Sequence, residues 1–286
     1  MTGGQTSFLI RKSDRLMGKA IKLLLVFILL QILGGAAAVP LVLVWQFVTT
    51  GTISAYEAGV STAVPGSLLV MFFTVWYLWK KGYLENDGQI YSPVSAGYLG
   101  WTFLAGLSAI MLMEGLMSVL DFLPDWLADT FDRMQGNWGG ILYLALLGPV
   151  LEELMFRGAI TRELLKRYRP AAAIVFSGLL FGLIHFNPVQ SVVAFLLGML
   201  LAWLYYRTRS VVPGIVVHVL NNSLSVWFSL TYPDVDHLYE PMGQTAYLVA
   251  LVLAAVVFAL SVWRLARYPK APDYDSPSVE PVRAGE

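Results

Sequence analysis

The sequence predicts an all-α polytopic membrane protein with about eight transmembrane helices. Of its 286 residues, 57% are hydrophobic and only 13% are charged, whereas about a quarter of the residues in a typical soluble domain are charged. The apolar residues fall in long runs of membrane-spanning length rather than in amphipathic stripes. No ten-residue segments of alternating polarity occur, and such segments would be typical of a membrane β-barrel.

Composition also excludes several kinds of chemistry. The chain has no cysteine, which rules out disulfides, thiol catalysis and cysteine-based metal sites. Its formal net charge is zero and no basic stripe with interleaved aromatic residues occurs. We therefore expect no nucleic-acid partner.

The apolar runs divide the chain into three parts. Residues 1–20 are polar and basic, residues 21–268 form the expected transmembrane helical domain, and residues 269–286 form a tail rich in proline, serine and acidic residues. The tail is expected to be disordered. The expected spans are, in chain order, 21–48, 61–79, 98–120, 138–158, 171–186, 189–206, 211–230 and 246–263.

The first span opens like a signal peptide, with a basic start, an apolar run and a cluster of small residues at 34–38. Its apolar run continues through Pro40 to Val48, which favours an uncleaved helix. Basic residues occur before this span and after the second, fourth, sixth and eighth spans, whereas Arg133 is the only basic residue in the alternate, acidic loops. This positive-inside pattern predicts a multi-pass protein of the cell membrane, embedded in its lipids, with both termini cytoplasmic.

Three ionisable residues, Glu152, Glu153 and Arg157, lie inside the otherwise apolar fourth span. An ionisable group at bilayer depth is energetically costly, so it is usually paired or used. Glu153 and Arg157 are four residues apart and share a helix face, with the acid N-terminal as this pairing prefers. Glu152 points about 100° away from Glu153. One carboxylate can therefore be held by the arginine while the other faces a cavity.

Two further spans carry polar side chains. Phe181 and His185 lie four residues apart in the fifth span, and His218 and Asn222 have the same spacing in the seventh. Counting about 1.5 Å per residue from the cytoplasmic basic residues places Glu152 roughly 15 Å deep and His218 roughly 14 Å deep. The same count gives roughly 20 Å for Asn222 and 24 Å for His185. At these depths the four side chains can converge on one cavity.

These residue types suit the hydrolysis of an amide by an activated water molecule. A carboxylate in a poorly hydrated cavity can act as a general base, and a neutral imidazole beside it can help to hold the water. A second imidazole and an amide NH2 group can donate hydrogen bonds to a developing oxyanion. No serine lies next to a histidine in these motifs, and Ser223 and Ser225 are expected to bond their own helix backbone.

The motifs Glu-Glu-x-x-x-Arg, Phe-x-x-x-His and His-x-x-x-Asn, in this order, resemble the CPBP family. This family groups type II CAAX prenyl proteases, bacteriocin-processing proteins and Abi-type proteins. The resemblance covers about residues 139–227, which would be the catalytic core. It implies an intramembrane endopeptidase with an eight-helix core and a conical cavity open to the cytosol. The substrate would be a protein or peptide, in some cases lipidated, cut near its C-terminus.

The resemblance also assigns roles to residues. Glu152 would be the catalytic glutamate and His185 its partner on the water, while His218 and Asn222 would form the oxyanion pocket. No metal or other cofactor is implied. The supporting residues would be Glu153, Arg157 and Phe181.

Two other functions fit the same residues. Zinc could be held by His185, His218 and one of the two glutamates, as in a metalloprotease, although His-Glu-x-x-His is absent from the sequence. Alternatively, the protein could be a transporter-like binding protein or an immunity factor that cuts nothing. Transporters often show paired internal repeats, and none is found here.

Taken singly, each motif also has a structural explanation. A glutamate–arginine pair in a membrane is often structural, and a lone histidine or asparagine more often bonds a neighbouring helix. Outside the motifs, Glu114 is expected to be a structural acid near the outer end of the third span. His237 is expected to be a solvated loop residue.

Overall fold

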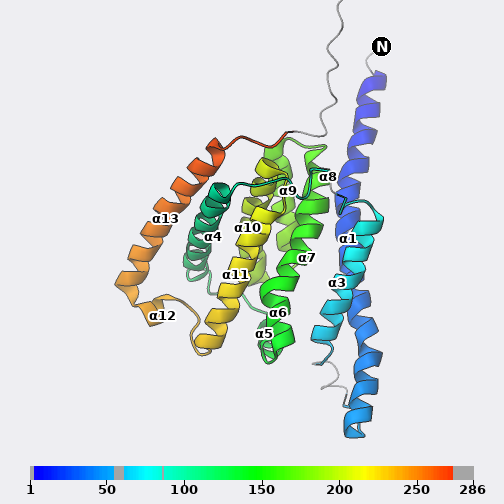
Figure 1. Cartoon of the computed structure of the whole chain (residues 1–286), viewed down its shortest axis with the longest axis vertical. Coiled ribbons are helices and arrows are strands. Elements are labelled where there is room, and N and C mark those ends of the chain that lie inside the picture. The colour runs from blue at the N-terminus through cyan, green and yellow to red at the C-terminus, as the bar shows by residue number, and fades with distance from the viewer. Residues whose placement is uncertain (1–2, 55–60, 86, 273–286) are drawn as a thin grey trace, which may run out of the picture.

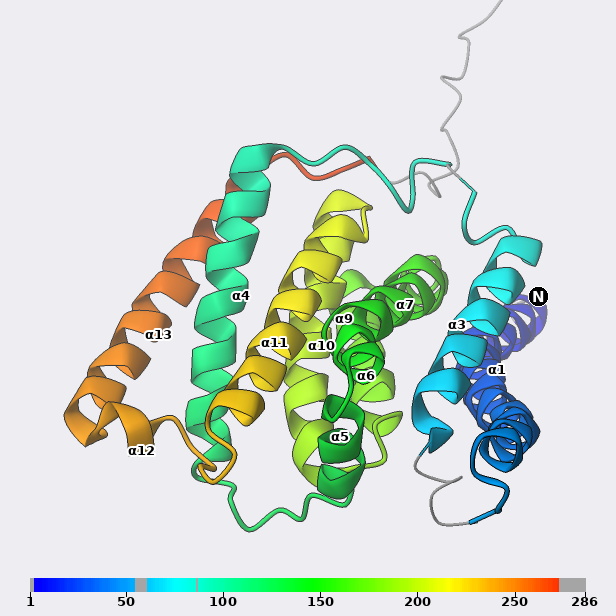
Figure 2. The ribbon, with the colours of Figure 1, turned by 60° about the horizontal axis from the view of Figure 1, so that its bottom comes forward.

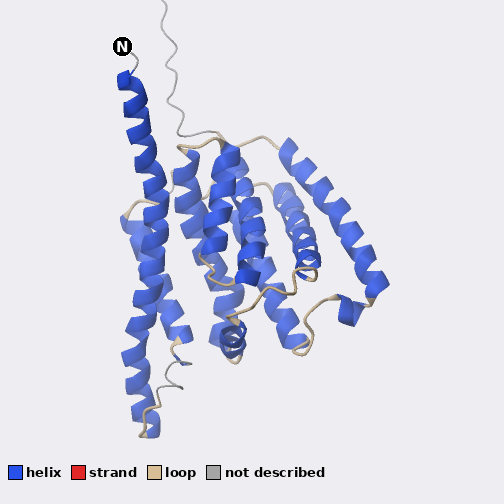
Figure 3. Cartoon of the chain, turned by 180° about the vertical axis from the view of Figure 1, so that it is seen from behind, coloured by secondary structure: helices blue, strands red, loops and turns tan. Residues whose placement is uncertain are grey.

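The computed structural model describes residues 3–54, 61–85 and 87–272, and it gives side chains in the first helix from Gly18 onward. Within these ranges all regular secondary structure is helical, and an isolated bridge between Tyr91 and Ser210 is the only β-pairing (Figures 1 and 3). The expected all-α membrane class is therefore confirmed. Most of the expected disordered tail, residues 273–286, lies outside the described residues.

Six helical segments in the described part of the chain are long and apolar enough to cross a membrane. The expected number of eight is not confirmed. The two other expected spans correspond to α9 (Pro170–Leu183), which has only 14 residues, and to α11 (Val212–Thr231), which carries His218 and Asn222. The six are α1 (Gly3–Thr50, counted from Gly18), α3 (Ala63–Lys80), α4 (Ala96–Met117), the segment Trp138–Leu165, α10 (Pro188–Thr208) and α13 (Gln244–Arg267).

The segment Trp138–Leu165 is one helical rod that contains two π-helical stretches. Its parts are α6 (Trp138–Leu142), η1 (Tyr143–Leu147), α7 (Gly148–Met155), η2 (Phe156–Thr161) and α8 (Arg162–Leu165). The two π-helical stretches flank the short α7 that carries Glu152 and Glu153. Such stretches are rare and frequently occur at functional sites, because they interrupt the regular hydrogen-bond ladder.

Figures 1 and 2 show three groups of helices side by side. The helices α1 and α3 pair at one edge, α4 and α13 pair at the opposite edge, and the rod with α9, α10 and α11 lies between them. In this arrangement α11 packs against both α4 and α7, so it joins the central group to one outer pair. Short helices α5 (Ala128–Gln135) and α12 (Tyr239–Met242) lie toward the end of the bundle opposite the start of α1 (Figure 1).

Glycines let α9 and α10 approach closely. A Cβ atom at Gly178 would lie 2.8 Å from the carbonyl oxygen of Phe195, and one at Gly198 would lie 3.0 Å from the Cα atom of Gly178. Small residues at helix contacts are the usual means of close packing in membranes. The close pairing fixes the position of α9, which carries Phe181.

The fifth span ends earlier than expected, at Leu183 rather than at residue 186. A residue that precedes proline is disfavoured in the helical conformation, and Asn187, before Pro188, is extended (φ −135°, ψ 114°). Phe186 has a left-handed backbone (φ 48°). His185 therefore lies in the turn between α9 and α10 rather than inside a helix.

Large apolar side chains cover the outside of the bundle. Trp45 on α1 is 69% exposed and Val252 on α13 is 65% exposed. A soluble monomer rarely exposes such apolar faces, whereas a bilayer would cover them. The start of α1 and the end of α13 lie toward the same end of the molecule (Figure 1).

Candidate active site

Glu153, Arg157 and His218 form a buried hydrogen-bonded cluster between the rod and α11. Arg157 Nη1 donates to Glu153 Oε1 at 2.7 Å, and His218 Nδ1 donates to the same oxygen at 3.0 Å. The side chains of Glu153 and Arg157 are fully buried, and that of His218 is 4% exposed. Because a carboxylate only accepts hydrogen bonds, the Nδ1 atom of His218 carries a proton. In the neutral imidazole its Nε2 atom is then an acceptor.

Gly214 leaves the space that Glu153 occupies. A Cβ atom at Gly214 would lie 2.3 Å from Glu153 Oε2, and real Cβ atoms do not approach so closely. Gly214 lies four residues before His218, so both residues face the rod from the same side of α11. One face of α11 therefore provides both the space for Glu153 and a hydrogen-bond donor to it.

Arg157 connects the cluster to α9 and α10. Its Nη2 atom donates to the carbonyl oxygen of Gly198 at 3.0 Å, and its guanidinium carbon lies 4.5 Å from the centre of the Phe181 ring, a cation–π contact. The ring of Phe181 also meets His185 and His218 edge to face, with centroid distances of 5.0 and 5.5 Å. Phe181 thus packs against the arginine and both histidines.

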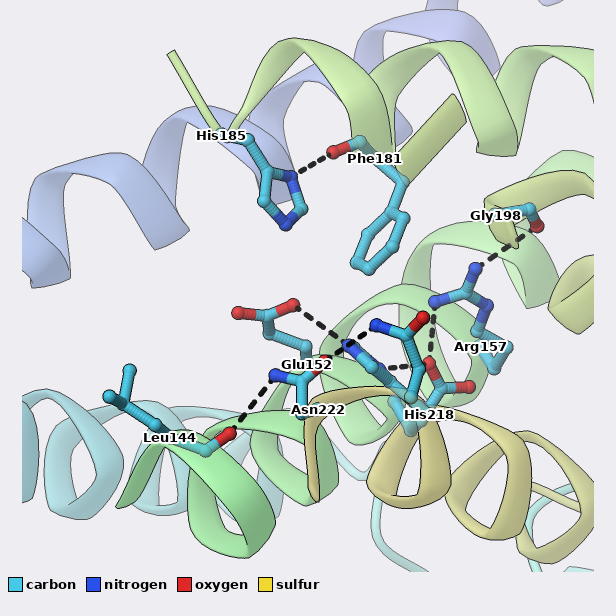
Figure 4. A network of polar contacts seen from close by, with 10 residues as sticks. Leu144, Glu152, Arg157, Phe181, His185, Gly198, His218 and Asn222 are labelled. Atoms are coloured by element: carbon cyan, nitrogen blue, oxygen red, sulfur yellow. Dashed lines mark hydrogen bonds and ion pairs between the residues drawn. The ribbon is translucent and has the colours of Figure 1, made fainter. Parts of the chain in front are cut away.

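Glu152 points away from this buried cluster. Its side chain is 28% exposed, and its Oε2 atom lies 3.8 Å from His218 Nε2. This distance is too long for a direct hydrogen bond. The adjacent glutamates therefore have different surroundings, because Glu153 is held by two donors while Glu152 keeps its carboxylate accessible (Figure 4).

His185 is fixed by its own backbone. Its Nδ1 atom donates to the carbonyl oxygen of Phe181 at 2.7 Å, because a carbonyl can only accept. This hydrogen bond leaves Nε2 unprotonated in the neutral ring. In Figure 4 the ring of His185 points toward the carboxylate of Glu152 from the α9 side.

Asn222 lies one turn after His218 on α11 and bonds to η1. Its Nδ2 atom donates to the carbonyl oxygen of Leu144 at 3.0 Å, and its Oδ1 atom accepts from Asn221 Nδ2 at 3.1 Å. The π-helical stretch interrupts the ladder at Leu144. The amide of Asn222 carries a second N–H, which is the group that an oxyanion would require.

The structure therefore brings the seven residues expected from the sequence into one cluster. It also shows partners that the sequence did not indicate: Gly214, Asn221 and the carbonyl groups of Leu144 and Gly198. A signal existed for Gly214, because it shares a helix face with His218. The sequence contains no signal for the contacts made by the two backbone carbonyl groups.

Glu114 and His237 lie apart from this cluster, near α12. Glu114 accepts from the backbone N–H of Leu238 at 2.9 Å and from the hydroxyl of Tyr247 at 2.5 Å, so it joins α4 to α13 and to the segment before α12. The expectation that His237 is solvated was wrong, because its side chain is only 12% exposed and contacts Asp121 at 3.3 Å. The acidic residues of α4 and of the following loop cover it.

Among the residues that the structure describes, no group of three or more histidine and carboxylate side chains is arranged as a set of metal ligands. In the cluster itself, His218 Nδ1 is directed to Glu153 and His185 Nδ1 to a backbone carbonyl. Each histidine would have only Nε2 to offer a metal.

Residues 134–224 match the family described as type II CAAX prenyl endopeptidase Rce1-like. The matched range contains every residue of the cluster, from Leu144 to Asn222. This segment belongs to the CPBP family. The CPBP segment spans about a third of the chain, and the helices α1, α3, α4 and α13 lie outside it.

Two curated proteins are similar to this CPBP segment. The chain is 30% identical over 100 residues to the membrane-embedded CAAX protease MroQ of Staphylococcus aureus, covering 33% of this chain and 40% of MroQ. It is 29% identical over 90 residues to a Bacillus subtilis protein named as membrane peptidase YdiL, covering 32% and 37%. The chain thus spans about two fifths of the length of these relatives. No solved structure matches it significantly.

Proposed function

We propose that the protein is an intramembrane endopeptidase of the CAAX-protease type, in which Glu152 activates water. The observation that carries this proposal is the different state of two adjacent carboxylates. Glu153 is fully buried and accepts from Arg157 and His218, whereas Glu152 is 28% exposed and faces His218 Nε2. A carboxylate that lies beside hydrogen-bond donors, but accepts no hydrogen bond from them, can accept a proton from water.

In the proposed reaction, Glu152 removes a proton from a water molecule as the water oxygen bonds to the carbonyl carbon of the peptide. His185 Nε2 accepts the second hydrogen of that water and orients it. The resulting oxyanion accepts hydrogen bonds from Asn222 Nδ2 and from the Nε2–H of His218 in its imidazolium form. Glu152 then gives its proton to the leaving nitrogen, the C–N bond breaks, and a carboxylic acid and an amine are released.

The proposed reaction requires His218 in its imidazolium form because of the hydrogen bond that its ring already makes. Its Nδ1–H donates to Glu153, so the ring can donate from Nε2 only when it is doubly protonated. The carboxylates of Glu152 and Glu153 lie beside the two ring nitrogens, at 3.8 Å from Nε2 and 3.0 Å from Nδ1. Arg157, through Glu153, therefore acts as a positioning residue for His218 in this proposal.

We also propose a class of substrate. The names of the matched family and of MroQ suggest the C-terminal tail of a lipidated protein, and a peptide leader is the other candidate. We further propose that both termini are cytoplasmic, because the basic residues lie at alternate loops and both ends of the helical domain lie on one side (Figure 1). The site would then take its substrate from the cytosol.

The test uses the full-length protein in detergent or bicelles. Fluorogenic C-terminal CAAX peptides, with and without a farnesyl group, would be incubated with wild type, Glu152→Gln and Glu114→Gln. Glu114 is a matched control, since it is a helix glutamate that bonds to the outer loop instead of to the cluster. We expect cleavage by wild type and by Glu114→Gln, and a decrease of about two to four orders of magnitude in Glu152→Gln.

Two outcomes would favour the alternatives. Activity lost on chelation and restored only by added zinc would support a metalloprotease. A folded wild-type protein that binds these peptides and cleaves none, while mass spectrometry finds no new termini in membrane proteins, would support a non-catalytic binding protein.

A further inference from the structure

We infer that Asn187 is the positioning residue for His185, because its buried side chain anchors the turn that carries His185 to the outer loop at Asp125 and Trp126. The role of His185 rests on the proposed function. The anchoring of the turn rests on geometry alone.

The turn between α9 and α10 needs an anchor. After Leu183 the chain leaves the helix, and His185 is followed by Phe186 with a left-handed backbone (φ 48°). A left-handed conformation is unfavourable for a residue with a large side chain and persists only when its surroundings hold it. The Phe186 side chain is 63% exposed, so packing of the ring cannot supply that restraint.

Asn187 supplies this restraint on the turn through both the NH2 group and the oxygen of its side-chain amide. Its Nδ2 atom donates to Asp125 Oδ1 at 2.8 Å, and its Oδ1 atom accepts from the backbone N–H of Trp126 at 3.1 Å. The residue is only 1% exposed. Asp125 Oδ1 also accepts from the backbone N–H of Leu127 at 3.0 Å, which orders the loop around the contact. A residue two positions from His185 is thereby joined to a segment about 60 residues away in the sequence.

Helix capping does not explain this side chain. Asn187 is the N-cap residue of α10, a position where asparagine usually bonds the first free N–H groups of the helix. Here the side chain makes no capping hydrogen bond, and it turns to the loop instead. The backbone carbonyl of Asn187 still accepts from the N–H of Ser191 at 2.8 Å, so the start of α10 does not require the side chain.

The consequence is a specific defect when the amide is lost. His185 would keep its hydrogen bond to the carbonyl of Phe181, but the turn would no longer be fixed relative to the outer loop. A catalytic group displaced by about 1 Å can slow chemistry by about a hundredfold. Since Asn187 faces the loop, the change should affect kcat rather than KM.

The experiment compares four variants of the full-length protein with one control variant. Asn187→Ala removes the anchor, and Asn187→Ser removes it while restoring a good helix cap. Asn187→Asp sets two carboxylates against each other, and the addition of Asp125→Asn to it restores a donor–acceptor pair. Ser191→Ala, in the first turn of α10, is the control. If capping were the role of Asn187, the serine variant would behave as wild type.

Two readouts separate this inference from the proposed function. The chain has three histidines, so the ring resonances of isotopically labelled histidine can be assigned by single substitutions, and His185 can be followed without any substrate. We expect the Ala, Ser and Asp single variants to shift and broaden the His185 signal and to lower kcat about ten- to hundredfold. The double variant Asn187→Asp with Asp125→Asn should return both the His185 signal and kcat toward their wild-type values.

Unchanged His185 resonances in Asn187→Ala and Asn187→Ser would overturn the inference, even if the wild type cleaves peptides. Failure of the wild type to cleave any peptide, with the shift of His185 still present, would instead count against the proposed function only. If the alanine variant does not fold, the exchange pair decides. An exchange variant as defective as Asn187→Asp alone would contradict the anchor.

Discussion

The Nε2 atom of His218 and the Oε2 atom of Glu152 lie 3.8 Å apart, while the opposite nitrogen of the same ring donates to Glu153 at 3.0 Å. The imidazole therefore lies between an accessible carboxylate and a buried one. The distance between Glu152 and His218 is too long for a direct hydrogen bond. A small rotation of either side chain would bring the two groups into contact.

A double-mutant comparison tests whether Glu152 and His218 work as a unit. We expect Glu152→Gln and His218→Gln each to reduce peptide cleavage by about two to four orders of magnitude. The double variant should fall at most about tenfold further, because residues that serve one step are not additive. Rate effects of the two changes that simply multiply would show that the residues act separately.

Substitution of Gly214 on α11 should displace Glu153 on α7 and so reduce activity. In Gly214→Ala the new methyl group would overlap Glu153 Oε2, and Glu153 cannot move without losing its bonds to Arg157 and His218. We expect at least a hundredfold loss of cleavage and a lower unfolding temperature. Gly100→Ala is the matched control: Gly100 lies in α4 with open space around it, and alanine should be neutral or stabilise the helix by about 0.5–1 kcal/mol. Equal unfolding temperatures and activities in both variants would refute the steric argument.

Loss of Arg157 should reduce stability as well as activity. Arg157→Ala would leave Glu153 buried with one donor fewer and would remove the contacts to Gly198 and Phe181. Breaking a buried ion pair from one side costs about 3–5 kcal/mol. Thermal unfolding and expression level are the measurements, with Glu152→Gln as the comparison, since a change at this partly exposed residue should remove activity and keep stability. An Arg157→Ala protein as stable as wild type would mean that Glu153 is neutral or hydrated.

Asn222→Ala should slow the chemistry without unfolding the protein. The change removes the N–H proposed for the oxyanion and one bond to the carbonyl of Leu144. Loss of one oxyanion donor typically costs about two to three orders of magnitude in kcat. We expect KM to stay within about threefold of wild type in steady-state assays. A KM that rises while kcat is constant would instead assign Asn222 to substrate binding.

The proposed topology can be tested by labelling, because the chain has no cysteine of its own. Single cysteines at the exposed positions Thr52 and Asp234 should react with an impermeant maleimide added to intact cells. A cysteine at the exposed Lys81 should react only after the cells are opened. The reverse pattern would place both termini outside.

Prediction from the sequence succeeded where the information is local. Apolar run lengths gave the helices, and the four-residue spacing gave the contact of Glu153 with Arg157. The contact of Glu153 with His218 joins residues 65 positions apart, so depth counting could suggest proximity but could not choose the atom or the carboxylate. The space that Glu153 occupies beside α11 depends on Gly214, which does not follow from hydropathy.

Boundaries and loops were less predictable for the same reason. The expected end of the fifth span at residue 186 was wrong, because α9 ends at Leu183 and Phe186 has a left-handed backbone, so His185 lies in a turn. The side chain of Asn187 bonds to a loop about 60 residues earlier in the sequence. Long-range hydrogen bonds of this kind depend on how the helices pack, which one sequence does not specify.

The shortness of α9 has a consequence for the surrounding lipid. Its 14 residues extend about 21 Å, against a hydrocarbon thickness of about 30 Å, and Val175, Leu179 and Leu183 expose one side of it. Lipids beside that side must shorten or tilt, since this mismatch is relieved by local thinning of the bilayer. A thinned bilayer would bring headgroups and their hydration closer to the depth of His185, which is where a hydrolase inside a membrane needs its water. The rate of cleavage should accordingly rise in bilayers of short-chain lipids and fall in long-chain ones.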